Sequence, residues 1–365
     1  MIRLITTATT TSSLLIFLAF FLLFCIFFFF LPQNQPLPQS KMADSHSGKY
    51  SNAYKRLHIV PNPDGTITRL PDFFPTVPPN SSSSSTHSVS KDAPINHVNR
   101  TWARLFLPRE ALSGSHPKSK LPILVFVHGG GFILCSAADP LFHGFCADAA
   151  SRLGALIVSI EYRLAPEHRL PAPYDDVLEA LTWVRDGKDE WVREYGDLSR
   201  CVLMGESAGG NIVYNAGLMA AHRVEDLKPL IIKGLVLIQP YFGGLELTGS
   251  ELRLANDVVL PLDVNELMWS MALPVGANRS HEYCNPTVGG GSDLLDRVRD
   301  LGWRVGVLAS DGDPLFDRDV ELAKLMEKKG IKVKSMQSKR DSHGVFVSDH
   351  TKRKDLYNFV MEFLS

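Results

Sequence analysis

One stretch of this sequence decides the fold: CVLMGESAGG, residues 201–210. Residues 201–204 are an apolar run of strand length, and residues 211–221 that follow have helical character. A Gly-x-Ser-x-Gly motif between a strand and a helix is typical of a nucleophile elbow, a sharp turn that exposes a serine hydroxyl at the carboxyl end of a sheet. We therefore predict that Ser207 is a nucleophile, and that its two flanking glycines let neighbouring chain pass close by.

Apolar runs of strand length recur along the chain, and each is apolar on both faces. Amphipathic helical stretches lie between them, for example at residues 174–185 and 318–329. This alternation predicts an α/β fold with a mostly parallel central sheet and helices on both of its faces. The predicted strands are residues 123–127, 155–160, 201–204, 234–238 and 305–308.

A second motif, HGGGF at residues 128–132, directly follows the first of these strands. Glycine amides have no Cβ beside them, so the backbone can approach a substrate oxygen closely. After a strand of this fold, such a loop is typical of an oxyanion hole. We expect the amides of Gly130 and Gly131 to be donors, with the amide of Ala208 as the third, and we expect His128 to be structural.

A serine hydroxyl needs an adjacent base, and in this chain order an acid and then a histidine should follow it. The late histidines are His281, His343 and His350. His343 lies on the loop after a strand that we expect at residues 331–336, where a base can reach back over the sheet, whereas His350 lies nearer a charged terminal stretch and is the weaker choice. The acid should follow the preceding strand. We favour Asp313, which stands before a proline, over Asp311, and we expect Asp317 to cap a helix.

Residues 161–172 leave a predicted strand with several charges and two prolines. We expect Arg163 and Glu167 to form an ion pair that braces the floor of the site. This is a structural role rather than a catalytic one.

Composition narrows the function classes. The 365 residues are 45% hydrophobic and 21% charged, which excludes a disordered, collagenous or coiled-coil chain. With 38 basic and 39 acidic residues, the net charge of −1 gives no basic field for nucleic acid. The five cysteines are scattered, so we expect free thiols and no metal site, and the predicted chemistry needs no cofactor.

The N-terminus contains 18 consecutive apolar residues, at positions 14–31. As a helix they would span about 27 Å, close to the thickness of a bilayer, so we expect a transmembrane anchor rather than a cleaved signal peptide. The alternative is a start at Met42, which removes this segment. If Met1 is the start, we expect a single-pass, membrane-anchored protein. With a start at Met42 we expect it in the cytoplasm, and the nucleus is a further location to consider.

The predicted domain organisation has three parts. Residues 1–41 hold the apolar segment and a tether, and residues 42–100 form an N-terminal cap with lead-in strands. Residues 101–365 form the catalytic domain, with a helical cap insertion at about 245–280.

Taken together, the motifs resemble the plant carboxylesterases of the hormone-sensitive-lipase-like branch of the α/β-hydrolases. The resemblance is carried by residues 128–132, 162–166 with 171–172, 205–209, 313–315, 343–344 and the segment 257–286. It implies an α/β-hydrolase fold with a cap over the pocket. It also implies a triad of Ser207, Asp313 and His343. Members of this group usually begin near the position of Met42.

The resemblance implies a serine carboxylesterase that hydrolyses small carboxylic esters through an acyl-enzyme. Two alternatives remain open at this point. Gibberellin receptors resemble the same family but have lost the catalytic histidine, whereas His343 is present here. Hydroxyisoflavanone dehydratases are lyases that share the fold and the elbow, and fold alone does not separate them from esterases.

Overall fold

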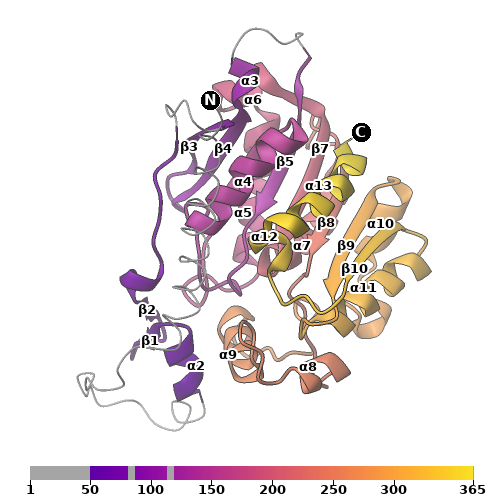
Figure 1. Ribbon diagram of the computed structural model, residues 1–365. Helices are drawn as coiled ribbons and strands as arrows, with labels where there is room; N and C mark the ends of the chain where they lie inside the picture. Colours follow the sequence, from indigo (N-terminus) through magenta and orange to yellow (C-terminus); the bar gives the residue numbers. More distant parts are fainter. Residues whose placement is uncertain (1–49, 81–86, 113–118, 365) are drawn as a thin grey trace, which may run out of the picture. The chain divides into compact units, whose positions relative to one another are not determined.

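A single large sheet organises the part of the chain that the computed structural model describes, residues 50–80, 87–112 and 119–364. Its strands are β3 (Ser88–Asn96), β4 (Thr101–Pro108), β5 (Leu121–Val127), β6 (Leu156–Glu161), β7 (Gly196–Glu206), β8 (Ile232–Ile238), β9 (Arg304–Ser310) and β10 (Lys332–Ser338). They lie in the order β10-β9-β8-β7-β5-β6-β4-β3 (Figure 1). The strands from β10 to β6 in this order are parallel, and β4 and β3 join antiparallel. The predicted α/β-hydrolase fold, with its mostly parallel sheet, is therefore confirmed.

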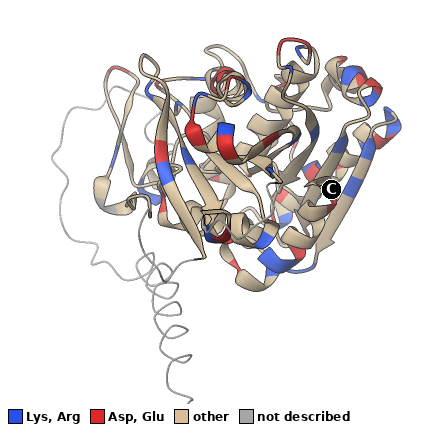
Figure 2. Ribbon diagram, turned by 90° about the horizontal axis from the view of Figure 1, so that it is seen from above, with Lys and Arg blue, Asp and Glu red and all other residues tan. Residues whose placement is uncertain are grey.

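Helices cover both faces of the sheet. The α-helices of the described residues are α2 (Ser51–Arg56), α3 (Arg109–Leu112), α4 (Pro140–Leu153), α5 (Ala172–Arg185), α6 (Glu190–Tyr195), α7 (Ala208–Ala221), α8 (Gly249–Arg253), α9 (Leu262–Ala272), α10 (Leu294–Asp300), α11 (Phe316–Lys328), α12 (Val345–Ser348) and α13 (His350–Leu364). Helices α4, α12 and α13 pack on one face, while α5, α7, α10 and α11 contribute to the core on the other. Acidic and basic residues are interspersed over these helices and the loops (Figure 2).

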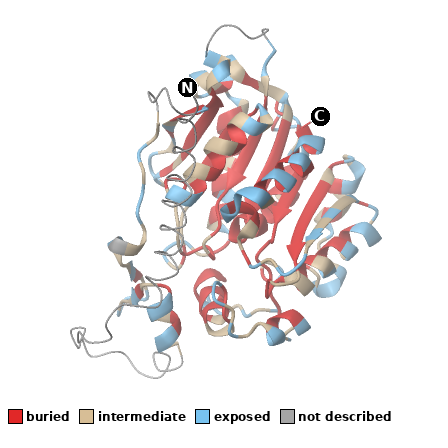
Figure 3. Ribbon diagram, viewed as in Figure 1, coloured by how far each residue is buried: buried red, intermediate tan, exposed pale blue. Residues whose placement is uncertain are grey.

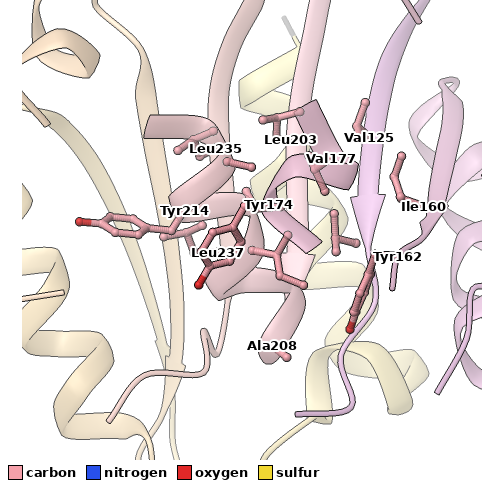
Figure 4. Packing of buried hydrophobic residues seen from close by; sticks show 14 of the residues in the cluster. Val125, Ile160, Tyr162, Tyr174, Val177, Leu203, Ala208, Tyr214, Leu235 and Leu237 are labelled. Carbon is pink, nitrogen blue, oxygen red and sulfur yellow. The ribbon is translucent and has the colours of Figure 1, made fainter. Parts of the chain in front are cut away.

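The central strands are buried on both faces, which explains their continuous apolar runs. In β5, Val125 belongs to one hydrophobic cluster and the next residue, Phe126, belongs to the other. Figure 3 shows the buried central strands and the exposed outer sides of the helices. Figure 4 shows part of the cluster that contains Val125, which also includes Leu203 and Leu235 of the sheet and Tyr174 of α5. A rigid sheet of this kind fixes the positions of the loops at its carboxyl edge.

Helices α8 and α9 lie in the connection between β8 and β9, beyond the carboxyl ends of the parallel strands (Figure 1). Helix α2 packs against α9, so an N-terminal segment and the β8–β9 connection meet there. The short strands β1 (Ile59–Pro61) and β2 (Ile67–Arg69) form a separate antiparallel pair after α2.

The expectation of a single-pass membrane protein is corrected by the structure. No helix among the described residues combines the length and the apolar character that crossing a membrane requires. The 15 residues of α13, for example, rise by only about 22 Å, and they carry charges. The segment proposed as the anchor, residues 14–31, itself lies outside the described residues.

Candidate active site

The elbow around Ser207 joins the carboxyl end of β7 to the start of α7. Ser207 has φ 54° and ψ −120°, a strained conformation that costs a non-glycine residue about 1–3 kcal/mol. Two hydrogen bonds hold it there. Its amide donates to the carbonyl of Ile238 at 2.9 Å, and the amide of Tyr241 donates to its carbonyl at 2.8 Å. Strand β8 and the loop that follows it therefore fix the strained turn.

The two glycines of the elbow are required by the close passage of backbone. A Cβ on Gly205 would lie 2.1 Å from the carbonyl oxygen of Gly209. A Cβ on Gly209 would lie 2.0 Å from the carbonyl oxygen of Val127 in β5. Both distances are far shorter than any ordinary carbon–oxygen contact, so only glycine fits at these positions, for the reason inferred from the sequence.

Three side chains that are distant in the sequence meet at this turn. His343 Nε2 lies 2.9 Å from Ser207 Oγ, and His343 Nδ1 lies 2.8 Å from Asp313 Oδ2. Both are hydrogen-bond lengths, and all three residues are buried. The hydroxyl, imidazole and carboxylate thus form one continuous chain, an arrangement that can activate a serine. The alternative acid, Asp311, instead accepts a hydrogen bond from the backbone amide of Arg340.

Sequence reasoning missed Gln239, which follows β8 and is fully buried. Its side-chain Nε2 donates to Asp313 Oδ2 at 2.7 Å and to the carbonyl of Ser342 at 3.2 Å. Its Oε1 accepts a hydrogen bond from the amide of Gly344 at 2.9 Å. One amide group therefore contacts the carboxylate and both chain neighbours of His343. The only signal in the sequence was its place directly after an apolar strand, at the carboxyl edge of the sheet.

The surroundings of His343 favour its protonated form. Burial alone disfavours an imidazolium and lowers the pKa of His343, but the nearby carboxylates of Asp313 and Glu206 more than offset this effect. The pKa of His343 therefore lies above the usual 6.5, at about 9. A base with a raised pKa takes a proton from a hydroxyl more readily.

The glycine loop after β5 offers unshielded amides. Gly130 has φ 108° and Gly131 has φ 60°, conformations that glycine adopts without strain. A Cβ would lie 2.2 Å from the carbonyl oxygen of Leu134 at the first position, and 2.2 Å from Met268 Sδ at the second. Within the described part of the chain, the amides of Gly130, Gly131 and Ala208 donate no hydrogen bond to another protein group. Such amides are the donors that an oxyanion hole requires.

His128 supports this loop and has no contact with the triad. Its Nδ1 donates to the carbonyl of Gly129 at 2.8 Å, and its ring stacks on Tyr162 with 4.3 Å between ring centroids. The Tyr162 hydroxyl donates to the carbonyl of His128 at 3.1 Å. Burial lowers the pKa of His128 to about 4, so the ring is neutral at physiological pH. These contacts agree with the structural role expected for it.

The predicted ion pair between Arg163 and Glu167 is wrong. Arg163 Nη2 instead lies 2.7 Å from Oδ1 of Asp176, a fully buried carboxylate on α5. Glu167 Oε2 lies 3.0 Å from Arg69 Nη2 of β2. The chain turns after β6, so Arg163 and Glu167 each form an ion pair with a residue of another element and not with each other.

Asp317 does not cap α11, because that helix begins one residue earlier, at Phe316. Its Oδ2 accepts a hydrogen bond from the amide of Ser250 at 2.7 Å, at the start of α8. The Ser250 hydroxyl in turn donates to the carbonyl of Pro314 at 2.8 Å. These bonds tie the connection between β8 and β9 to the loop that carries Asp313.

The described residues contain no cluster of three or more His, Cys, Asp or Glu side chains that is arranged to hold a metal ion. The four described cysteines, Cys135, Cys146, Cys201 and Cys284, are free thiols, and Cys25 lies outside the described residues. Burial raises the pKa of Cys146 and of Cys201 to about 12, so neither thiol forms a thiolate readily.

A comparison with known protein families identifies the fold family. A family model described as the alpha/beta hydrolase fold matches residues 124–347. The chain belongs to this family. The matched region runs from β5 to α12 and contains the elbow, the glycine loop and the positions of Ser207, Asp313 and His343.

Relatives within this family narrow the assignment. The chain is 47% identical to Carboxylesterase 20 of Arabidopsis thaliana over 322 residues, which is 88% of this chain and 98% of that protein. It is 43% identical to 3-O-acetylpapaveroxine carboxylesterase CXE2 of Papaver somniferum, over 75% of this chain and 90% of that protein. This protein is thus a plant carboxylesterase of the hormone-sensitive-lipase-like branch, as the motifs suggested. It is an enzyme that hydrolyses carboxylic esters.

A solved structure agrees in architecture. The esterase of Pyrobaculum calidifontis has a TM-score of 0.62 and 25% sequence identity, and the similarity covers 76% of this chain and 84% of that one. The carboxylesterase EstE1 from a metagenomic library also has a TM-score of 0.62, at 22% identity, over 79% of this chain and 92% of that one. The second similarity concerns the fold alone.

Proposed function

We propose that this carboxylesterase works as a serine hydrolase on small carboxylic esters, with Ser207 as nucleophile, His343 as general base and Asp313 as the acid that orients it. The observation that carries the proposal is the continuous chain of hydrogen bonds from Ser207 through His343 to Asp313, at 2.9 and 2.8 Å. No metal or cofactor takes part in this chemistry.

In the acylation step, Ser207 Oγ attacks the ester carbonyl carbon while His343 Nε2 takes the hydroxyl proton. The resulting tetrahedral oxyanion accepts hydrogen bonds from the amides of Gly130, Gly131 and Ala208. His343 then returns the proton to the departing alcohol oxygen, which leaves the acyl group bonded to Ser207. Asp313 stays ionised and stabilises the imidazolium.

In the deacylation step, a water molecule takes the place of the alcohol. His343 removes a proton from this water, and the hydroxide formed attacks the acyl carbon. The second tetrahedral intermediate collapses when His343 returns the proton to Ser207 Oγ. The products are the carboxylic acid and the free enzyme.

We further propose that residues 42–100, of which 50–80 and 87–100 are described, form an N-terminal cap with lead-in strands, and that the insertion at about 245–280 completes the cap over a catalytic domain of residues 101–365. The packing of α2 against α9 supports the cap. So does the position of α8 and α9 beyond the carboxyl ends of the strands (Figure 1).

Substitution of Ser207 by alanine tests the proposal. We expect kcat/KM for phenyl acetate to fall by roughly 10⁴-fold or more, with the fold intact, because only binding and the oxyanion donors remain. The matched control is Ser199→Ala, at the exposed amino end of the same strand. Turnover close to that of the unmodified enzyme in well-folded Ser207→Ala protein would refute the nucleophile assignment.

A further inference from the structure

A second carboxylate borders the triad. Glu206 is the last residue of β7, directly before Ser207, and only 5% of its surface is exposed. A Cβ on Gly129 would lie 2.0 Å from Glu206 Oε2, and a Cβ on Gly344 would lie 3.7 Å from its Oε1. The carboxylate therefore fits between the glycine loop and the loop that carries His343. Glycine at position 129 leaves the space that the carboxylate occupies.

The orientation of Glu206 toward the imidazole is specific. Its Oε1 lies 3.9 Å from His343 Nε2, the same nitrogen that meets Ser207 Oγ. Asp313 holds the opposite nitrogen, Nδ1. The two carboxylates thus face the two sides of the ring, and Glu206 lies on the side where the proton of Ser207 arrives.

No group in the described part of the chain donates a hydrogen bond to the Glu206 carboxylate, although it is buried. Burial of a carboxylate is costly unless a charge or donor compensates. Burial accordingly raises the pKa of Glu206 to about 7, and the positive charge of His343 opposes that rise. Among the described residues, the other titratable groups that face Glu206 or His343 are Asp313, Asp257, Cys135 and Tyr162, none of which is a cation.

We propose that Glu206 is an electrostatic partner of His343, and that it stabilises the imidazolium from the Nε2 side as the ring takes the proton of Ser207. This inference rests on the proposed triad. Glu206 neither gives nor receives a proton in the reaction, because the transferred proton stays between His343 and the reacting oxygens. The field of Glu206 also selects substrates, favouring esters that are neutral or cationic near the reacting carbonyl over esters that carry a carboxylate there.

Glu206→Gln removes the charge and keeps the shape, so it separates the electrostatic role from packing. Without the charge, the imidazolium is less stable, and the pH at which kcat/KM reaches half of its plateau should fall by about one pH unit. For the same reason the plateau itself should fall by about tenfold or more. The readout is the hydrolysis of phenyl acetate, a neutral ester, followed by phenol release from pH 5 to 10.

Two further variants complete the test. Glu161→Gln is the matched control, because Glu161 is also a poorly exposed carboxylate with a pKa raised to about 7 by burial, but it bonds to Ser136 and the amide of Ala137. It should leave the half-plateau pH unchanged. If Glu206→Gln does not fold, Glu206→Asp keeps the charge but withdraws it from Nε2, and the half-plateau pH should shift in the same direction by a smaller amount.

Substrate charge gives an independent readout. The ratio of kcat/KM for monophenyl succinate, which carries a carboxylate, to that for phenyl acetate should rise severalfold in Glu206→Gln and stay constant in Glu161→Gln. An unchanged half-plateau pH in Glu206→Gln, or an equal shift in Glu161→Gln, would overturn the proposal. Failure of the triad itself is distinguishable, because a phosphonate ester would then label a residue other than Ser207 in every variant.

Discussion

Replacing Gln239 by leucine tests how the acid and base are held together. Leucine is of broadly similar size but has no polar atom, so the change removes all three hydrogen bonds of the Gln239 side chain. The lost bonds are those to Asp313 Oδ2 at 2.7 Å, to the Ser342 carbonyl at 3.2 Å and from the Gly344 amide at 2.9 Å. The loop that carries His343 then loses the two hydrogen bonds, at Ser342 and Gly344, through which Gln239 connects it to Asp313.

The magnitude follows from these bonds. A hydrogen bond to a charged group contributes about 1.5–3 kcal/mol and a neutral one about 1 kcal/mol, so the three together contribute about 3–5 kcal/mol. Part of this energy holds the fold, and the part that aligns His343 with Ser207 appears in kcat. If about half of it is used for alignment, kcat should fall by about 10- to 100-fold, since about 1.4 kcal/mol corresponds to a factor of ten. KM should change little, because Gln239 is fully buried behind the acid.

The assay is steady-state hydrolysis of phenyl acetate, together with thermal unfolding of each variant. Asn215→Leu is the control, since Asn215 is a buried amide on α7 that bonds to Asn211 and has no contact with the triad. It should lower the unfolding temperature without a comparable loss of kcat. If Gln239→Leu keeps its full kcat, or if both variants lose kcat in proportion to stability, the positioning argument is wrong.

Two further predictions concern pH and stability. Nearby carboxylates raise the pKa of His343 above 6.5, and the neutral imidazole is the form that acts as the base. We therefore expect kcat/KM for a neutral ester to rise with pH along a limb whose midpoint lies above pH 6.5. A measured midpoint at or below pH 6.5 would contradict this expectation. Arg163→Ala leaves the fully buried Asp176 without its ion-pair partner and should lower the free energy of unfolding by about 3–5 kcal/mol. Urea denaturation measures this change. A loss below about 1 kcal/mol would show that the ion pair does not have this role.

The strands at the centre of the sheet were predictable because they are buried on both faces. Their apolar runs are continuous, and the predicted run at 234–238 lies within β8 (Ile232–Ile238). The edge strand β10 has mostly exposed or half-buried residues, so its signal was weaker. The antiparallel strand β3 begins with three buried residues and then turns partly exposed, a pattern that local periodicity does not resolve.

The elbow, the glycine loop and His343 could be recognised because each depends on a local motif beside a strand. Gln239 and Glu206 could not, because their importance depends on distances to residues more than 70 positions away in the chain. The error over Arg163 has the same cause. A charge four residues away looked like its partner, whereas the true partner, Asp176, comes from the following helix.

The most direct test of the account is to identify the residue that carries the acyl group. The enzyme is mixed with a phosphonate ester that mimics the tetrahedral intermediate, digested, and mapped by peptide mass spectrometry. The account predicts one modified site, Ser207, and no modification in Ser207→Ala. A label on any other residue, or equal labelling of Ser207→Ala, would contradict it.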